Sequence, residues 1–326
     1  MLGVVQTLLW TAQHPLESPF YRTVGNSTLG LAEGILYAKA FGLSFGFLLL
    51  LFPRCLPNVA ELVRDRTRVC YILASVGLGY VSLSLYAYAQ SRLPGVVISI
   101  ILTSSPLSYS VALDYLKNRE LSWRARVRKY VTDRHIHVHT ALSFGVGLIM
   151  YLQSDKWFFE PLAGVSAFFV PLAFFMSYNL LSLATDLRDQ NVAAPPERRL
   201  AGAFLGTLFS AVLYLPIAYY TLTSIGHDVE PSRIPRDVWV LFITSAFVAG
   251  FLGHLFYFIS VNTFDENTLK SASLLQHFGP VFSFLIAFAL LQDTNHRGEF
   301  SFDYIYLSVF ISLSLFIAYW YIKNKQ

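Results

Sequence analysis

The chain has 326 residues, a formal net charge of +4, 13% charged residues and 55% hydrophobic residues. An ordinary soluble domain has roughly 25% charged residues, so this composition excludes a soluble domain of comparable size and predicts a polytopic α-helical membrane protein. The two cysteines, Cys55 and Cys70, have no spacing typical of a metal site or a disulfide framework, and we interpret them as ordinary thiols.

The N-terminal segment is apolar over residues 1–13 but too short to cross a bilayer, which needs about 20 residues in a helix. No Lys or Arg precedes Arg22, so the charged start of a signal peptide is absent. The segment is either a half-inserted tail or a shortened first transmembrane helix. A longer native N-terminus would also account for its length. The internal repeat described below favours the shortened helix.

Nine further stretches are long and apolar enough, or nearly so, to be transmembrane helices. Small residues and prolines within them suit packed membrane helices, and their all-round apolar character argues against alternating barrel strands. The predicted spans are 30–52, 69–90, 94–116, 139–154, 161–186, 200–222, 238–263, 269–291 and 302–322.

The chain repeats itself weakly. Gly79 and Gly253 are separated by 174 residues, as are Pro106 and Pro280, so each glycine precedes its proline by 27 residues. Both pairs lie in a unit of helix, tight turn and second helix with an interior proline. Earlier in each half, Leu8-Leu9-Trp10 precedes the span 30–52 much as Met176-Ser177-Tyr178 precedes the span 200–222.

The repeat predicts two five-helix halves, residues 1–154 and 155–326, and about ten helices if residues 1–13 count as the first. Because five is odd, the second half must be inverted in the membrane, as in many secondary transporters. This arrangement places 17 of the 24 Lys and Arg residues on one side and 6 on the other, with Lys39 inside a helix. The positive-inside rule then predicts that both termini face the cytoplasm.

An ordered set of short motifs resembles the drug/metabolite transporter superfamily, and within it the EamA-like transporters. The resemblance covers nearly the whole chain, although the first helix is shorter and the loop 117–138 longer than is usual in that group. It rests on Leu8-Leu9-Trp10, Ser105-Pro106-Leu107, Asn118-Arg119-Glu120-Leu121-Ser122, Lys270-Ser271-Ala272-Ser273, Gly279-Pro280-Val281 and Gln292-Asp293. The resemblance implies solute transport by alternating access, with a site near the midplane between the halves.

Polar side chains inside apolar spans are costly and usually face a cavity or the interior of the bundle. Lys39 lies near the centre of its span, where it would pair with a carboxylate, an anionic solute or carbonyl dipoles, unless it extends to the interface. His254 and His277 suit proton coupling because histidine titrates near neutral pH, although a histidine bonded to a neighbouring helix is the plainer reading. The predicted substrate-binding residues are Lys39, Tyr80, Thr103, Tyr178, Asn179, His254, Gln276 and His277.

Pro106 and Pro280 each remove a backbone hydrogen bond, so they are candidate hinges or simply static kinks. His135, His137 and His139 would share a face only on an extended segment, and we predict no metal site and no cofactor. The expected partners are a small solute, anionic if Lys39 binds it, and membrane lipids. The chain could form a homodimer, and nothing indicates nucleic-acid binding.

Three functions compete. A secondary carrier of small organic solutes fits the inverted repeat best. A membrane-embedded enzyme would need convergent metal ligands or a nucleophile with its base, and no such motif is present, so we expect no enzyme. A non-transporting receptor-like or scaffold protein that retains the fold is the third reading, and a truncated first helix favours it.

If Lys39 contacts the solute through its charge, Lys39→Gln will weaken solute binding far more than Lys39→Arg, which keeps the charge. Binding measured by the thermal stability of the purified protein separates the two variants. Equal tolerance of both substitutions would remove Lys39 from the site.

Overall fold

The computed structural model describes residues 2–103, 122–132, 137, 160–186, 194–253, 255–256 and 279–291, together with seven residues between 309 and 320. These residues are almost entirely helical, and no strand occurs among them. Five helices in this part of the chain are long and apolar enough to cross a membrane. These are the features of an all-α membrane protein, as the composition predicts.

The first helix is longer than the sequence analysis expected. Helix α1 runs from Leu2 to Val24, 23 residues, and not only through the apolar residues 1–13. Pro15 and Pro19 lie inside it, and the polar residues between them made its second half look like a loop. At 1.5 Å per residue, α1 is about 34 Å long, enough to cross a bilayer core of about 30 Å.

The next two helices differ in character. Helix α2 (Thr28–Gly46) begins at Ser27, whose side chain accepts a hydrogen bond from the backbone N–H of Gly30, and continues into the short 3-10 segment η1 (Phe47–Leu51). Helix α3 (Cys55–Arg64) is amphipathic: it buries Cys55 and Leu62 and exposes Leu56 and Val63. We had expected a loop there, and such a helix is suited to a membrane–water interface.

Helix α4 (Arg66–Arg92) has a well-defined start. The side chain of Asp65 accepts hydrogen bonds from the backbone N–H groups of Thr67 and Arg68 at 2.9 and 3.3 Å, which satisfies donors that every helix start leaves open. The Arg68 backbone N–H and guanidinium hold the pKa of the Asp65 carboxyl below its usual range.

The remaining described helices, apart from α7, match predicted spans at least in part. The amphipathic helix α7 lies in the basic segment that was expected to be a loop. The bounds are α5, Gly95–Thr103; α7, Trp123–Thr132; α10, Pro161–Thr185; α11, Pro196–Ser224; α12, Arg236–Ser245; the π-helical segment η3, Ala246–Gly253; and α15, Gly279–Leu291. The spans predicted at 139–154 and 302–322, and parts of those at 94–116, 238–263 and 269–291, lie outside the described residues or contain only isolated ones.

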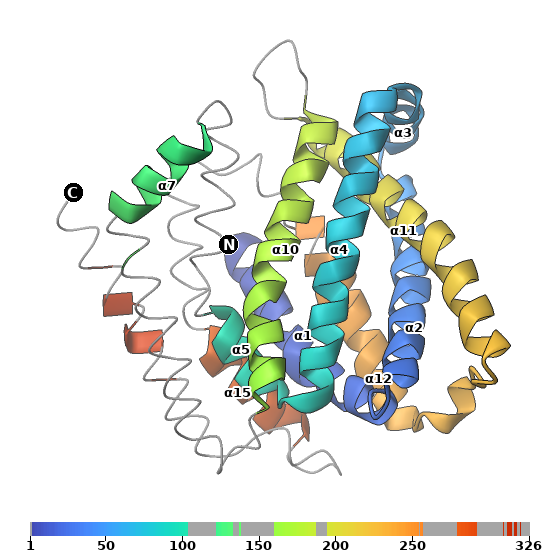
Figure 1. Ribbon diagram of the computed structural model, residues 1–326, viewed down its shortest axis with the longest axis vertical. Helices are drawn as coiled ribbons and strands as arrows, with labels where there is room; N and C mark the ends of the chain where they lie inside the picture. The colour runs from blue at the N-terminus through green and yellow to red at the C-terminus, as the bar shows by residue number, and fades with distance from the viewer. Residues whose placement is uncertain are drawn as a thin grey trace.

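Two long helix pairs, α4 with α10 and α2 with α11, lie side by side (Figure 1). Helices α4 and α10 are antiparallel, because the Ser75 hydroxyl donates to the Ser177 carbonyl and the Ser82 hydroxyl to the Val170 carbonyl, at 2.8 and 3.1 Å. Helices α2 and α11 are also antiparallel, with the Tyr214 hydroxyl donating to the Ala32 carbonyl at 3.1 Å near the start of α2.

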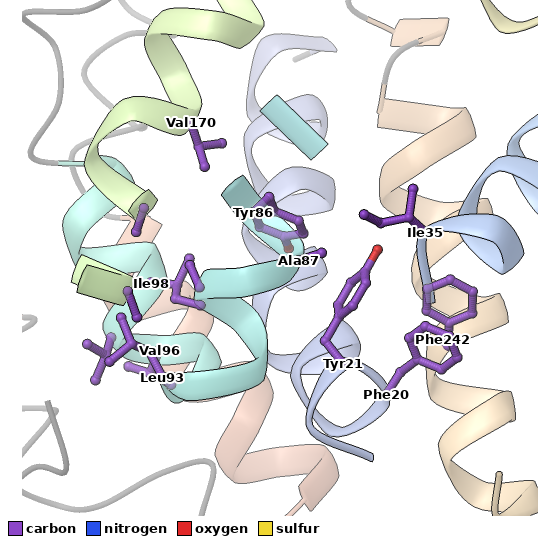
Figure 2. Packing of buried hydrophobic residues seen from close by; sticks show 14 of the residues in the cluster. Phe20, Tyr21, Ile35, Tyr86, Ala87, Leu93, Val96, Ile98, Val170 and Phe242 are labelled. Atoms are coloured by element: carbon purple, nitrogen blue, oxygen red, sulfur yellow. The ribbon is translucent and has the colours of Figure 1, made fainter. Parts of the chain in front are cut away.

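Helix α1 lies within the bundle. It packs against α2, α4, α5, α12, η3 and α15. It is parallel to α4 and antiparallel to α12 and η3, where the rings of Phe20 and Phe242 are stacked with centroids 3.8 Å apart (Figure 2). The larger hydrophobic cluster of the structure is built around this helix, with Phe20 and Tyr21 among its most buried side chains.

Close packing of α1 against the start of α5 depends on Gly95. A Cβ at Gly95 would collide with the His14 carbonyl, which is backbone and cannot rotate away, whereas a Cβ at Gly42 of α2 would meet nothing within 4 Å. We expect Gly95→Ala to lower the free energy of unfolding by about 1–3 kcal/mol, the usual cost of overpacking. Gly42→Ala is the matched control and should be neutral or slightly stabilising. Thermal unfolding in detergent measures both, and equal effects would contradict the packing described for α1.

Candidate functional site

The most unusual feature of the interior is a group of polar side chains between α1, α4 and α12. We call it the α1 polar cluster. Its members are Gln13, His14, Glu17 and Ser18 of α1, Tyr86 and Gln90 of α4, and Ser245 at the end of α12. Polar groups in a membrane interior are retained where they have partners or a function.

Glu17 is the charged centre of the cluster. Its side chain is 5% exposed, and Ser245 beside it is fully buried. The Gln13 amide donates to both carboxylate oxygens at 3.1 and 3.2 Å, and the Ser245 hydroxyl donates to Oε1 at 3.0 Å. Because Gln13 and Glu17 are four residues apart on one helix, they share a face, and Ser245 reaches the same carboxylate from the facing helix.

The other half of the cluster joins α1 to α4. The Tyr86 hydroxyl lies 3.1 Å from His14 Nδ1 and accepts a hydrogen bond from the Gln90 amide at 2.6 Å. It also interacts with the Glu17 carboxylate. One hydroxyl therefore joins three other polar side chains of the cluster, and Figure 2 labels Tyr86 on α4, which packs against α1. Gln90 Oε1 is buried and has no hydrogen-bond partner among the described residues.

A second buried carboxylate, Glu33, lies near the start of α2. It accepts a hydrogen bond from the Tyr37 hydroxyl at 2.8 Å and is paired with His227 Nε2 at 2.8 Å. His227 follows α11, so this pair connects the two halves of the chain near one end of the bundle. Unlike Glu17, Glu33 has a partner that can carry a positive charge.

The predicted site residues fall in several places. Lys39 is half-buried in α2, and no described residue forms a hydrogen bond or ion pair with it. Tyr80 of α4 packs beside Tyr214 of α11, with ring centroids 5.0 Å apart, on the larger hydrophobic cluster. Tyr178 of α10 packs beside Phe174 at 4.5 Å on the smaller cluster, and Asn179 is half-buried next to it in the chain. Tyr80 and Tyr178 therefore belong to different clusters.

The other predicted residues cannot be placed in the same way. Pro280 is buried and is the second residue of the described part of α15. Thr103 ends the described part of α5, and its side chain is outside the described residues, as are Pro106, His254, Gln276 and His277. In the part of the chain that the structure describes, no group of three or more His, Cys, Asp or Glu residues could hold a metal ion.

Sequence reasoning missed the α1 polar cluster because it ended the first helix at residue 13. A signal was present: Gln13 and Glu17 are four residues apart, as are His14 and Ser18, so a helix continued to Val24 would place two polar stripes side by side. Glu33 was missed although it lies within a predicted span.

No protein-family model matches the chain, and no curated protein matches it significantly. The functional argument therefore depends on the geometry of this molecule.

Tyr86→Phe tests whether the cluster is a connected network. It removes one hydroxyl and leaves buried hydrogen-bonding groups of His14 and Gln90 without their partner, which should lower the free energy of unfolding by about 1–3 kcal/mol. The control is Tyr88→Phe, which removes a hydroxyl that donates only to Glu160, next to the start of α10, and should cost less. Chemical unfolding in detergent compares the two, and a larger effect for Tyr88→Phe would contradict the network.

Proposed function

We propose that this protein is a secondary transporter of small organic solutes, built from two inverted five-helix repeats that move relative to each other by alternating access. The observation that carries the proposal is a set of mirrored contacts between the halves. It takes the equivalent residues from the weak sequence repeat and adds which of them are neighbours in space.

The mirrored contacts involve residues that the repeat makes equivalent. Gly79 and Gly253 are equivalent, as are Leu8-Leu9-Trp10 and Met176-Ser177-Tyr178. A Cβ at Gly79 would lie 3.2 Å from Ser177 Oγ, and a Cβ at Gly253 would lie 3.8 Å from Leu9 Cβ and 2.6 Å from the Trp10 ring. Each glycine thus packs against the first helix of the opposite half, at the corresponding triplet.

Helix pairs follow the same rule. The repeat makes four helix pairs equivalent: α1 and α10, α2 and α11, α4 and the α12–η3 helix, and α5 and α15. The contact of α1 with α12 and η3 therefore corresponds to the contact of α10 with α4. The contact of α1 with α15 corresponds to that of α10 with α5, and α2 with η3 corresponds to α11 with α4. Exchanging the two halves leaves the contact between α2 and α11 unchanged, and the same is true of the contact between α5 and α15.

The directions of the helices agree with inversion. Helix α10 is antiparallel to α4, which is parallel to α1, so the equivalent helices α1 and α10 run in opposite directions. Helices α2 and α11 are also equivalent and antiparallel. Two inverted halves that exchange equivalent contacts have two related arrangements of similar energy, and this is the structural basis of alternating access in transporters.

The interface between the halves also contains the features that a solute pathway requires. The α1 polar cluster places ionisable and amide groups at the contact between α1 and α12, and polar groups at membrane depth commonly mark solute or ion pathways. Next to it, η3 replaces α-helical geometry with π-helical geometry, which occurs frequently at functional sites. Lys39, half-buried and without a described partner, remains a candidate for contact with the solute.

The competing proposal of a non-transporting protein was based mainly on a truncated first helix. Helix α1 has 23 residues and fills its place in the bundle, which removes that argument. We propose no enzymatic function, because the sequence contains no catalytic motif and the buried polar groups described here bond with one another.

Basic residues concentrate at one end of the bundle, and we propose that this end faces the cytoplasm. The end carries α3 and the starts of α4 and α11, and Arg198 of α11 forms an ion pair with Glu61 of α3 at 2.7 Å. Its described basic side chains, excluding those of α7, are Arg54, Arg64, Arg66, Arg68, Arg198 and Arg199.

A thermal-shift panel on the purified protein tests for a solute. The compounds are amino acids, nucleobases, nucleotide sugars, sugar phosphates and organic cations, each at pH 6 and pH 8. A solute at 100 times its dissociation constant should stabilise the fold by about 2.7 kcal/mol, and Lys39→Gln or Tyr86→Phe should reduce that gain. Each hit is then tested for uptake and exchange in proteoliposomes. A folded protein that is stabilised by no compound and exchanges none of them would overturn the proposal.

A further inference from the structure

We infer that Glu17 is the residue that binds the coupling proton of this transporter, taking up one proton at its carboxylate on one side of the membrane and releasing it on the other. The inference rests on the proposed transport function and adds the identity of the coupling ion. Four observations support it: the burial of Glu17, its lack of a cationic partner, its hydrogen bonds, and its position between the two halves.

A buried charged group needs an oppositely charged partner, or it becomes neutral by binding or losing a proton. Glu17 is 5% exposed, and none of the ion pairs in the described part of the chain involves it. Its partners are neutral: the Gln13 amide, the Ser245 hydroxyl and the Tyr86 hydroxyl. A carboxylate in such surroundings is stable in the membrane interior when it carries a proton, and the ionised form depends on donors aimed at it.

The surroundings of Glu17 contain few other groups that could bind the proton instead. Tyr86 of α4 and Tyr21 of α1 face it, and His14 is linked to it through Tyr86. The described residues of α5, η3 and α15 include no titratable side chain. Helix α12 has Arg236 and Asp237 in its first turn, two turns or more from Ser245, and the titratable residues of α2 that are described form no bond with Glu17.

Protonation of Glu17 changes the hydrogen bonds that its carboxylate can form. The ionised carboxylate only accepts, and it receives bonds from Gln13 within α1 and from Ser245 across the interface between the halves. After protonation at Oε2 the carboxyl carries one O–H donor of its own, so that oxygen loses its contact with the Gln13 amide and its O–H needs an acceptor, while Oε1 can still accept from Gln13 and Ser245. Ser245 is the last residue of α12 before η3 begins, so the Glu17 carboxyl contacts the second half where its helix geometry changes.

Glu33 provides a matched control within the same chain. It is also a buried carboxylate on a helix of the first half, but it is paired with His227 and bonded to Tyr37. If any buried carboxylate could serve as the proton site, Glu33→Gln and Glu17→Gln would have the same effect. The arrangement of partners predicts that they differ.

Infrared difference spectroscopy of the purified protein, titrated across neutral pH without any solute, measures carboxylic acid groups directly. We expect a protonated carboxyl band that appears as the pH falls, is lost in Glu17→Gln and is retained in Glu33→Gln. Proton binding counted by pH titration should fall by one proton for Glu17→Gln. A band that survives in Glu17→Gln, or that is lost only in Glu33→Gln, would overturn the inference.

Ser245→Ala covers the case in which Glu17→Gln does not fold. This variant leaves the carboxylate in place and removes one donor, so the pH at which the band appears should move. The control is Ser283→Ala, which removes a buried hydroxyl of α15 that has no partner among the described residues. In this control the pH at which the band appears should stay the same. Because these measurements use only protons, a titrating Glu17 in a protein that moves no solute would refute the transport proposal and not the proton site. If the protein transports solute but Glu17 never titrates, the proton site is refuted and the transport proposal stands.

Discussion

The structure depends on enclosing one helix. Helix α1 carries the polar residues Gln13, His14, Glu17 and Ser18, and lipid would offer no hydrogen bonds to such groups. The remaining described helices supply what the lipid cannot. Helix α4 contributes Tyr86 and Gln90, α12 contributes Ser245, and the start of α5 approaches the α1 backbone so closely that only glycine fits at position 95. A helix too polar to count among the apolar spans is thus the centre of the bundle.

The same helix connects the two halves of the chain. Helix α1 packs against α12 and η3, and α10, which is its equivalent in the proposed repeat, packs against α4. The two interfaces differ in chemistry: serine hydroxyls and carbonyls join α10 to α4, whereas a carboxylate and stacked aromatic rings join α1 to α12. The ends of the α4–α10 interface also carry charged groups, with Arg68 donating to the Ala184 carbonyl and Arg92 paired with Glu160. Under the proposed inverted arrangement, Glu17 has no counterpart carboxylate among the Ser75 and Ser82 contacts of that interface, so its protonation would act on the halves asymmetrically.

Much of the fold could be predicted from the sequence, and the limits have physical causes. Spans such as 161–186 and 200–222 are apolar all round and were correctly located as α10 and α11. Helix α1 was cut short because hydropathy penalises the polar residues that tertiary contacts stabilise. The candidate site was predicted less well: the predicted residues, such as Lys39 and Tyr80, lie outside the α1 polar cluster. Glu17 and Ser245 of that cluster are 228 residues apart, and no local pattern in the sequence indicates that they meet. The contacts of Gly79 with Ser177 and of Gly253 with Trp10 are likewise visible only in three dimensions.

The most direct test of the account is disulfide cross-linking of both interfaces in membranes, in a protein whose two native cysteines are replaced. The pairs are Ser75→Cys with Ser177→Cys, whose hydroxyls lie 3.0 Å apart, and Trp10→Cys with Gly253→Cys, where the indole contacts the glycine. The control replaces Ser75→Cys by Ser91→Cys, which lies about 24 Å farther along α4. The account predicts that both pairs form disulfides detectable by mass spectrometry and that the control does not. Cross-linking of the α4–α10 pair without the α1–η3 pair would show that α1 is not enclosed and would contradict the mirrored arrangement.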